Sequence, residues 1–163
     1  ALKPDLIVIS TGFWDATDRQ LPGDATWRHP GDPVYDAYMR QEFAGAADTL
    51  LASGAPLAWI DNPPIKLGRH EIGAAANYPV NEPRRMIRTN EIINEVAATR
   101  PAMRVIPYTA FMDAWPGGPL DPQLRPDGLH VDGPGGPLVA PWLGPEILAA
   151  YWDVKAGRPT PPR

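Results

Sequence analysis

The 163 residues correspond to one domain of ordinary size, and a hydrophobic fraction of 44% is enough for a buried core. The net charge of -4 comes without a basic cluster, which argues against a nucleic-acid partner. Cysteine is absent, which excludes disulfides, a cysteine nucleophile and cysteine-ligated zinc. No apolar run reaches the ~18 residues of a membrane-spanning helix, so we expect no direct insertion of this chain into a membrane.

The first predicted element is a strand over residues 6–9. This run is continuously apolar and rich in β-branched residues, which is typical of a strand in a parallel sheet with both faces buried. A turn at Gly12 follows, at the carboxyl end of the strand, where open α/β sheets bind ligands. Residues 16–31 are polar and contain Gly and Pro, and we expect them to form a loop.

A helix is predicted from Pro33 to about residue 53. Asp32 is a suitable N-cap, proline is favoured at the first helical position, and Gly54 suits the C-cap. Apolar residues recur every three or four positions, which indicates one buried face. The residues of that face are Tyr38, Phe43, Ala46, Ala47 and Leu50.

Two further strands and a second helix follow in alternation. Residues 56–60 and 103–107 are short apolar runs and are predicted strands, while residues 82–99 have helical periodicity. The connection over residues 65–81 is irregular, with a length typical of lids, binding loops or disordered segments. The buried face predicted for the helix consists of Met86, Ile93, Val96 and Ala97.

The last part of the chain is rich in proline and glycine. A short helical turn is expected near Phe111, and a helical element over residues 137–152. Pro141 and Pro145 predict a kink there, or two short helices. We therefore expect one domain over residues 1–153 and a loose, proline-rich tail over residues 154–163.

The alternation of strands and helices predicts an α/β fold of three layers, with a parallel sheet and right-handed crossovers. Three strands make a narrow sheet for two layers of helices. The chain also begins at Ala1, almost directly before a strand. We therefore expect that the first strands of the fold are missing and that this chain is a piece of a longer protein.

The segment Arg-Pro-Asp-Gly-Leu-His-Val-Asp-Gly at residues 125–133 brings a carboxylate and an imidazole to short spacing on a stiff loop. Gly128 allows backbone angles that other residues avoid, and Pro126 fixes one dihedral. Asp127 could accept the Nδ1–H of His130 and leave Nε2 free as a base. The alternative is a loop carboxylate and a surface histidine that never meet. With Asp132 these residues make a poor transition-metal site, so no metal and no cofactor is expected.

A nucleophile is the missing part of such a site. The chain has two serines, Ser10 and Ser53. Ser53 lies at a predicted helix end, and we interpret Ser10 as a strand-end hydroxyl bonded to the backbone. A nucleophilic serine usually lies on a sharp turn that also provides oxyanion donors, and neither serine has this setting.

Three segments resemble, in the same order, blocks of one enzyme superfamily. Residues 4–15, P-D-L-I-V-I-S-T-G-F-W-D, resemble its third block; residues 84–97, R-R-M-I-R-T-N-E-I-I-N-E-V-A, resemble the helix before its last strand. Residues 125–133 resemble its fifth block, whose Asp-x-x-His supplies an acid and a base. The chain thus resembles the C-terminal two-thirds of a GDSL/SGNH hydrolase domain. It is most similar to the SGNH domain fused to acyltransferase-3 family O-acyltransferases of the bacterial cell envelope.

The resemblance implies a flavodoxin-like SGNH fold and a Ser-His-Asp triad. Asp127 and His130 would be catalytic, and Gly12, Trp14 and Asp15 would bind the oxyanion or the substrate. Two departures are evident: the Gly-Asp-Ser block that carries the nucleophile is absent, and Trp14 replaces the asparagine that donates to the oxyanion. Trp14 could still donate through its indole N–H, or it could pack against the acyl or sugar group.

The function implied by the resemblance is transfer or hydrolysis of an acetyl or similar acyl ester on a carbohydrate, with the serine outside this chain. The expected partners are an acyl ester or carbohydrate substrate and a missing N-terminal segment or a membrane acyltransferase domain. The expected location is extracytoplasmic or membrane-associated through the parent protein. Two alternatives stay open: a non-catalytic, SGNH-like accessory module, and an α/β domain that binds a small ligand at the strand ends.

Overall fold

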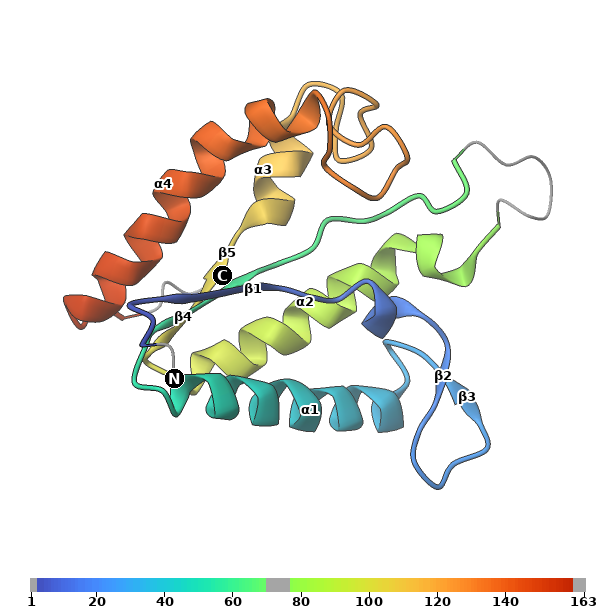
Figure 1. Ribbon diagram of the computed structural model, residues 1–163. Helices are drawn as coiled ribbons and strands as arrows, with labels where there is room; N and C mark the ends of the chain where they lie inside the picture. Colours follow the sequence, from blue (N-terminus) through green and yellow to red (C-terminus); the bar gives the residue numbers. More distant parts are fainter. Residues whose placement is uncertain (1–2, 70–76, 160–163) are drawn as a thin grey trace.

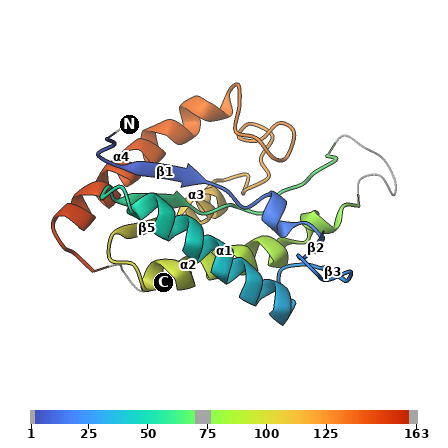
Figure 2. The ribbon, with the colours of Figure 1, turned by 60° about the horizontal axis from the view of Figure 1, so that its bottom comes forward.

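The computed structural model describes residues 3–69 and 77–159, and its centre is a parallel sheet of three strands in the order β1-β4-β5. Helices lie on both faces of this sheet (Figures 1 and 2). The strands are β1 (Ile7–Ser10), β4 (Leu57–Ile60) and β5 (Met103–Ile106), and the helices are α1 (Pro33–Leu51), α2 (Pro83–Ala98), α3 (Tyr108–Ala114) and α4 (Gly135–Lys155). The predicted α/β class, with parallel strands joined by helices, is confirmed.

Alternate side chains of the strands point to opposite faces of the sheet. On one face, Leu57, Trp59 and Met103 pack in the main core with buried residues of α1 and α2. On the other face, Ala58 and Ile106 pack with α4. The continuous apolar runs of the sequence are therefore explained by strands that are covered on both sides.

Helix α1 begins as the sequence predicts. The side chain of Asp32 accepts hydrogen bonds from the backbone N–H of Val34 at 2.8 Å and of Tyr35 at 3.4 Å. The buried row of the helix follows a four-residue spacing: Tyr35, Met39, Phe43 and Ala47. Ala46 was wrongly placed on this face and is exposed, because it lies one position around the helix from that row.

The segment predicted as a loop over residues 16–31 contains more structure than expected. A short 3-10 helix, η1 (Trp14–Ala16), precedes an antiparallel pair of strands, β2 (Arg19–Gln20) and β3 (Trp27–Arg28). Asp24 closes the turn between them, since it accepts hydrogen bonds from Thr26 N at 2.9 Å and Arg28 Nε at 2.6 Å. Strands of two residues are too short to give a periodic signal in the sequence.

Helix α4 is continuous from Gly135 to Lys155, so the alternative of two short helices was wrong. Pro141 and Pro145 each remove one backbone donor from the helix. The carbonyls that lose a partner belong to Pro137 and Pro141, which are exposed, so water can bond to them. The helix also extends past residue 153, where we placed the domain boundary.

The remaining predicted elements are found near their expected positions. All four residues of the predicted face of α2 are buried: Met86, Ile93, Val96 and Ala97. The expected irregular connection includes the short 3-10 helix η3 (Pro79–Asn81). Residues 70–76 of that connection and residues 160–163 of the tail lie outside the described residues.

The two edges of the sheet differ in how well they are covered. All four residues of β5 are buried. In β1, Ile7 and Ile9 pack against the main core, but Val8 is 40% exposed and Ser10 is exposed. Because α4 lies over β4 and β5, the outer strand β1 keeps one open face and one open edge.

An open edge of this kind predicts self-association, because unpaired strand backbone and an exposed apolar side chain favour pairing with another chain. We expect concentration-dependent association of the wild-type chain in analytical ultracentrifugation. The substitution Val8→Lys should reduce it and leave the thermal unfolding midpoint nearly unchanged.

Ile9→Lys is the matched control, because the side chain of Ile9, next to Val8 in the strand, packs against the main core. It should destabilise the fold by about 1–3 kcal/mol. A wild-type chain that stays monomeric at every concentration tested would contradict the prediction.

Candidate functional site

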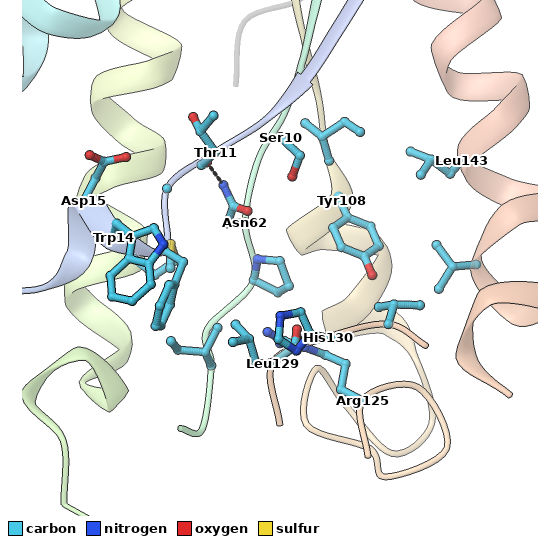
Figure 3. A pocket seen from close by; sticks show the side chains of 18 of the residues that line it. Ser10, Thr11, Trp14, Asp15, Asn62, Tyr108, Arg125, Leu129, His130 and Leu143 are labelled. Atoms are coloured by element: carbon cyan, nitrogen blue, oxygen red, sulfur yellow. Dashed lines mark hydrogen bonds between the residues drawn. The ribbon is translucent and has the colours of Figure 1, made fainter. Parts of the chain in front are cut away.

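The candidate site is a pocket of about 880 Å³ at the carboxyl ends of β1 and β4 (Figure 3). One wall is the segment that follows β1, and another is the first half of α4. The loop after α3 closes the pocket with the 125–131 segment. Polar or aromatic side chains in its lining include Ser10, Trp14, Asn62, Tyr108, Arg125 and His130.

Asp127 and His130 meet as the sequence predicts. The ring Nδ1 of His130 lies 2.7 Å from Oδ2 of Asp127. The other carboxylate oxygen accepts the backbone N–H groups of Leu129 at 2.8 Å and of His130 at 2.7 Å. An ionised carboxylate can only accept, so Nδ1 carries a proton, and in the neutral imidazole Nε2 is then the nitrogen with a free lone pair. The interpretation of two groups that never meet was wrong.

The electrostatics of Asp127 favour this arrangement. Partial burial acts to raise the pKa of Asp127, but the hydrogen bonds from the His130 ring and from two backbone N–H groups outweigh it and lower this pKa to about 2. The carboxylate therefore stays ionised at neutral pH. It fixes the tautomer of His130, whose side chain is 68% exposed at the mouth of the pocket.

Gly128 sets the shape of the loop between the two residues. Its φ is +82°, which favours glycine, and a Cβ there would lie 2.5 Å from the backbone oxygen of Lys66. The backbone N–H of Lys66 donates to the carbonyl of Gly128 at 3.0 Å. The loop is thus docked against the segment that follows β4.

The buried side chain of Arg125 anchors the same loop through hydrogen bonds to its backbone. Arg125 was not among the predicted site residues. The residue is only 2% exposed. Its Nε donates to Leu129 O at 2.9 Å, and its Nη1 donates to Pro64 O at 2.6 Å and Pro119 O at 3.1 Å. One side chain therefore joins three stretches of backbone around the pocket. Its position two residues before Asp127 was the only signal in the sequence.

Gly12 and Asn62 come together across the ends of β1 and β4. Gly12 has a φ of +140°, and a Cβ there would lie 2.6 Å from Nδ2 of Asn62. The Asn62 amide donates to the carbonyl of Thr11, and its backbone is bonded to the side chain of buried Asn90 at 3.0 and 2.7 Å. Within the part of the chain that the structure describes, the backbone N–H of Gly12 has no partner. Sequence reasoning missed Asn62, although its place directly after a strand was a usable signal.

Trp14 and Asp15 both line the pocket, in different ways. Trp14 is 70% exposed and packs edge-to-face on Phe13 with ring centroids 4.6 Å apart, so it is not a core residue. In Figure 3 the carboxylate of Asp15 points away from His130. Burial raises the pKa of Asp15, and the nearby Arg19 opposes this. Of the two residues, Trp14 is the better placed to contact a ligand.

Neither serine is bonded to the histidine. Ser10 lines the pocket, but its hydroxyl makes no hydrogen bond within residues 3–69 and 77–159, so the expected bond to backbone is not found. Ser53 donates to Leu50 O at 2.9 Å at the end of α1. Among the described residues, no side chain bonds to Nε2 of His130. The described residues thus provide an acid–base pair without a bonded nucleophile.

Metal ligands do not cluster in the described parts of the chain. No group of three or more histidine, aspartate or glutamate side chains there is arranged to hold an ion. Asp132 therefore does not combine with Asp127 and His130 into such a group.

Comparisons of the chain with protein-family models, with curated proteins and with solved structures find no match.

Gly128→Ala tests whether the loop depends on glycine. Because of the φ of +82° and the close approach of a Cβ to Lys66 O, the substitution should destabilise the fold by more than about 1 kcal/mol. It should also shift the Nδ1 resonance of His130. Gly133→Ala is the control, because Gly133 has a φ of +47° with open space around it. Equal losses of stability in the two variants would show that the packing on Lys66 contributes nothing.

The pKa of Asp127 gives a test by pH. Because its folded-state pKa lies below the unfolded value, its contribution to stability is present above about pH 4 and is lost as the pH falls through about 2. We expect carbon-detected NMR titration to give a pKa near 2 in the wild type. His130→Ala should raise this pKa, though not to its ordinary value, because the two backbone N–H groups remain. An unchanged pKa in that variant would contradict the pairing.

Proposed function

We propose that this chain supplies the acid–base half of a Ser-His-Asp site for acyl-ester chemistry of the SGNH type. The observation that carries the proposal is the hydrogen bond of 2.7 Å between His130 Nδ1 and Asp127 at the mouth of a pocket. The reaction is hydrolysis of an acyl ester on a carbohydrate of the cell envelope, or transfer of an acetyl or similar short acyl group to it.

In the proposed mechanism, His130 is first a base and then an acid. Nε2 takes the proton from a serine hydroxyl as its oxygen attacks the ester carbonyl carbon. The tetrahedral intermediate collapses to the acyl-enzyme, and Nε2 gives that proton to the departing alcohol. Water or a sugar hydroxyl then attacks the acyl-enzyme by the same route and regenerates the serine. Asp127 orients the ring and stabilises the imidazolium.

The developing oxyanion requires preorganised donors. The backbone N–H of Gly12 is unpartnered within the described residues, and Gly12 lines the same pocket as His130. Asn62 adds a side-chain amide beside it, although one of its N–H groups is used by Thr11. Asn62 would take the place of the donor that is lost at Trp14, and Trp14 would pack on the acyl or sugar group.

We propose that the serine comes from outside this chain, on a segment that covers the open side of β1. A strand that is added parallel to β1 would end at the same edge of the sheet as β1 and β4, which is the edge that forms the pocket. The finer fold in this proposal is a flavodoxin-like SGNH fold that lacks its first strands here. The segment would belong to the parent protein or to a membrane acyltransferase domain.

A location outside the cytoplasm or at the membrane, reached through the parent protein, follows from this proposal. Within residues 3–69 and 77–159, no helix combines the length and hydropathy needed to cross a membrane.

A non-catalytic, SGNH-like accessory or ligand-binding module is the second candidate. The observation in its favour is that no nucleophile is bonded to His130 within the described residues. A module of this kind would keep the pocket and the loop but carry out no ester chemistry, whatever segment is joined to it.

Activity separates the two candidates. We expect this chain to hydrolyse activated acetyl esters no faster than its His130→Ala variant, and a serine-directed fluorophosphonate to leave it unlabelled. Loss of a triad serine typically lowers kcat by about 10⁶. The product of the complete reading frame that contains this chain should show both hydrolysis and labelling, and His130→Ala in that product should abolish hydrolysis.

Ser10→Ala is the control for the present chain and should change neither result. Stoichiometric labelling of Ser10 would show that the nucleophile is already here. If the complete product is also inactive and unlabelled, the accessory module is the better description.

A further inference from the structure

The guanidinium of Arg125 is buried without an acidic partner. Within the described residues no carboxylate lies at ion-pair distance from it, and its three hydrogen bonds all go to backbone carbonyls. These bonds use Nε and Nη1, which leaves Nη2 without a hydrogen bond in the same residues. A buried cation with a spare donor is costly unless an acceptor reaches it.

A second polar group in the pocket is also unpartnered. The hydroxyl of Tyr108 is buried and has no hydrogen-bond partner within residues 3–69 and 77–159. Its ring is held by stacking on Phe111 and Trp142, with centroids 6.3 and 6.2 Å apart. In Figure 3 the hydroxyl points toward the loop that carries Arg125 and His130. Burial raises the pKa of Tyr108, with Arg125 opposing, so the hydroxyl stays protonated and can donate.

The rest of the pocket is lined mainly by apolar side chains. Ile60 and Ile65 come from β4 and the loop after it, Met86 from α2, and Val139 and Leu143 from α4. A volume of about 880 Å³ exceeds what a single ion would fill. Arg125 and Tyr108, the residues that carry the two spare donors, thus line a chamber suited to an apolar body.

We propose that this pocket binds a monocarboxylate with a short to medium apolar chain, with the carboxylate at Arg125 and Tyr108. One nitrogen and one hydroxyl match the two oxygens of a carboxylate, whereas a phosphate would leave further oxygens without donors. The apolar chain lies along α4. This inference does not rest on the proposed acyl chemistry, because binding requires neither a serine nor turnover.

The test is a titration of the full chain, followed by NMR, with three probes of equal length: hexanoate, hexanamide and hexanol. We expect hexanoate to shift the methyl signals of Val139 and Leu143 and to bind at least about tenfold more tightly than either neutral probe, since it alone forms charge-assisted hydrogen bonds. Inorganic phosphate should not displace it.

Tyr108→Phe removes one donor and keeps the stacked ring, so the fold should be as stable as before or slightly more stable. It should weaken hexanoate binding by about threefold to tenfold and leave hexanol binding unchanged. Tyr38→Phe is the matched control, because Tyr38 packs on the main core, away from the pocket, and should alter neither affinity.

Several results would overturn the inference. These are no binding of hexanoate, equal affinities for hexanoate and hexanamide, displacement of hexanoate by phosphate, and an unchanged hexanoate affinity in Tyr108→Phe. Because none of these readouts involves hydrolysis, they stand apart from any failure of the proposed acyl chemistry.

Discussion

The geometry of the pocket depends on the buried guanidinium of Arg125. It bonds to the backbone of Pro64 after β4, of Pro119 in the long loop and of Leu129 next to His130. Burial lowers the pKa of Arg125 to about 10, yet the group stays charged at neutral pH. Hydrogen bonds from a charged donor are stronger than neutral ones. Arg125 thus fixes a loop of some twenty residues, rich in proline and glycine, to the segment that follows β4, next to the contact between Lys66 and Gly128.

Much of this arrangement could be predicted because its causes are local in the sequence. Asp127 reaches His130 because only two residues lie between them and one of these is a glycine with positive φ, and both features are visible in the sequence. The three strands of the parallel sheet were evident from apolar runs, and α1 from its aspartate cap. These signals require no knowledge of what lies across the fold.

The features that were missed depend on contacts between distant segments. Asn62 matters because it meets Thr11, fifty-one positions earlier, and Arg125 because it reaches Pro64, sixty-one positions away. Pro141 and Pro145 are compatible with one helix because their turns face solvent, which depends on tertiary packing. Positions near a strand end and near Asp127 placed Asn62 and Arg125 close to the site, but spacing along the chain does not show which backbone groups they contact.

The charged groups of the pocket lie at different depths from the surface. His130 and the ionised Asp127 lie at the mouth, where solvent screens them, while Arg125 lies almost fully buried. A carboxylate side chain in contact with Arg125 would neutralise the guanidinium, but it would also fill the pocket space beside that group. Backbone carbonyls accept the hydrogen bonds of the guanidinium, and Asp127 attracts its charge without bonding to it. A chain that needed Arg125 only to fix the loop would gain nothing from leaving Nη2 and the Tyr108 hydroxyl unpartnered, so these two groups favour a ligand as the missing acceptor.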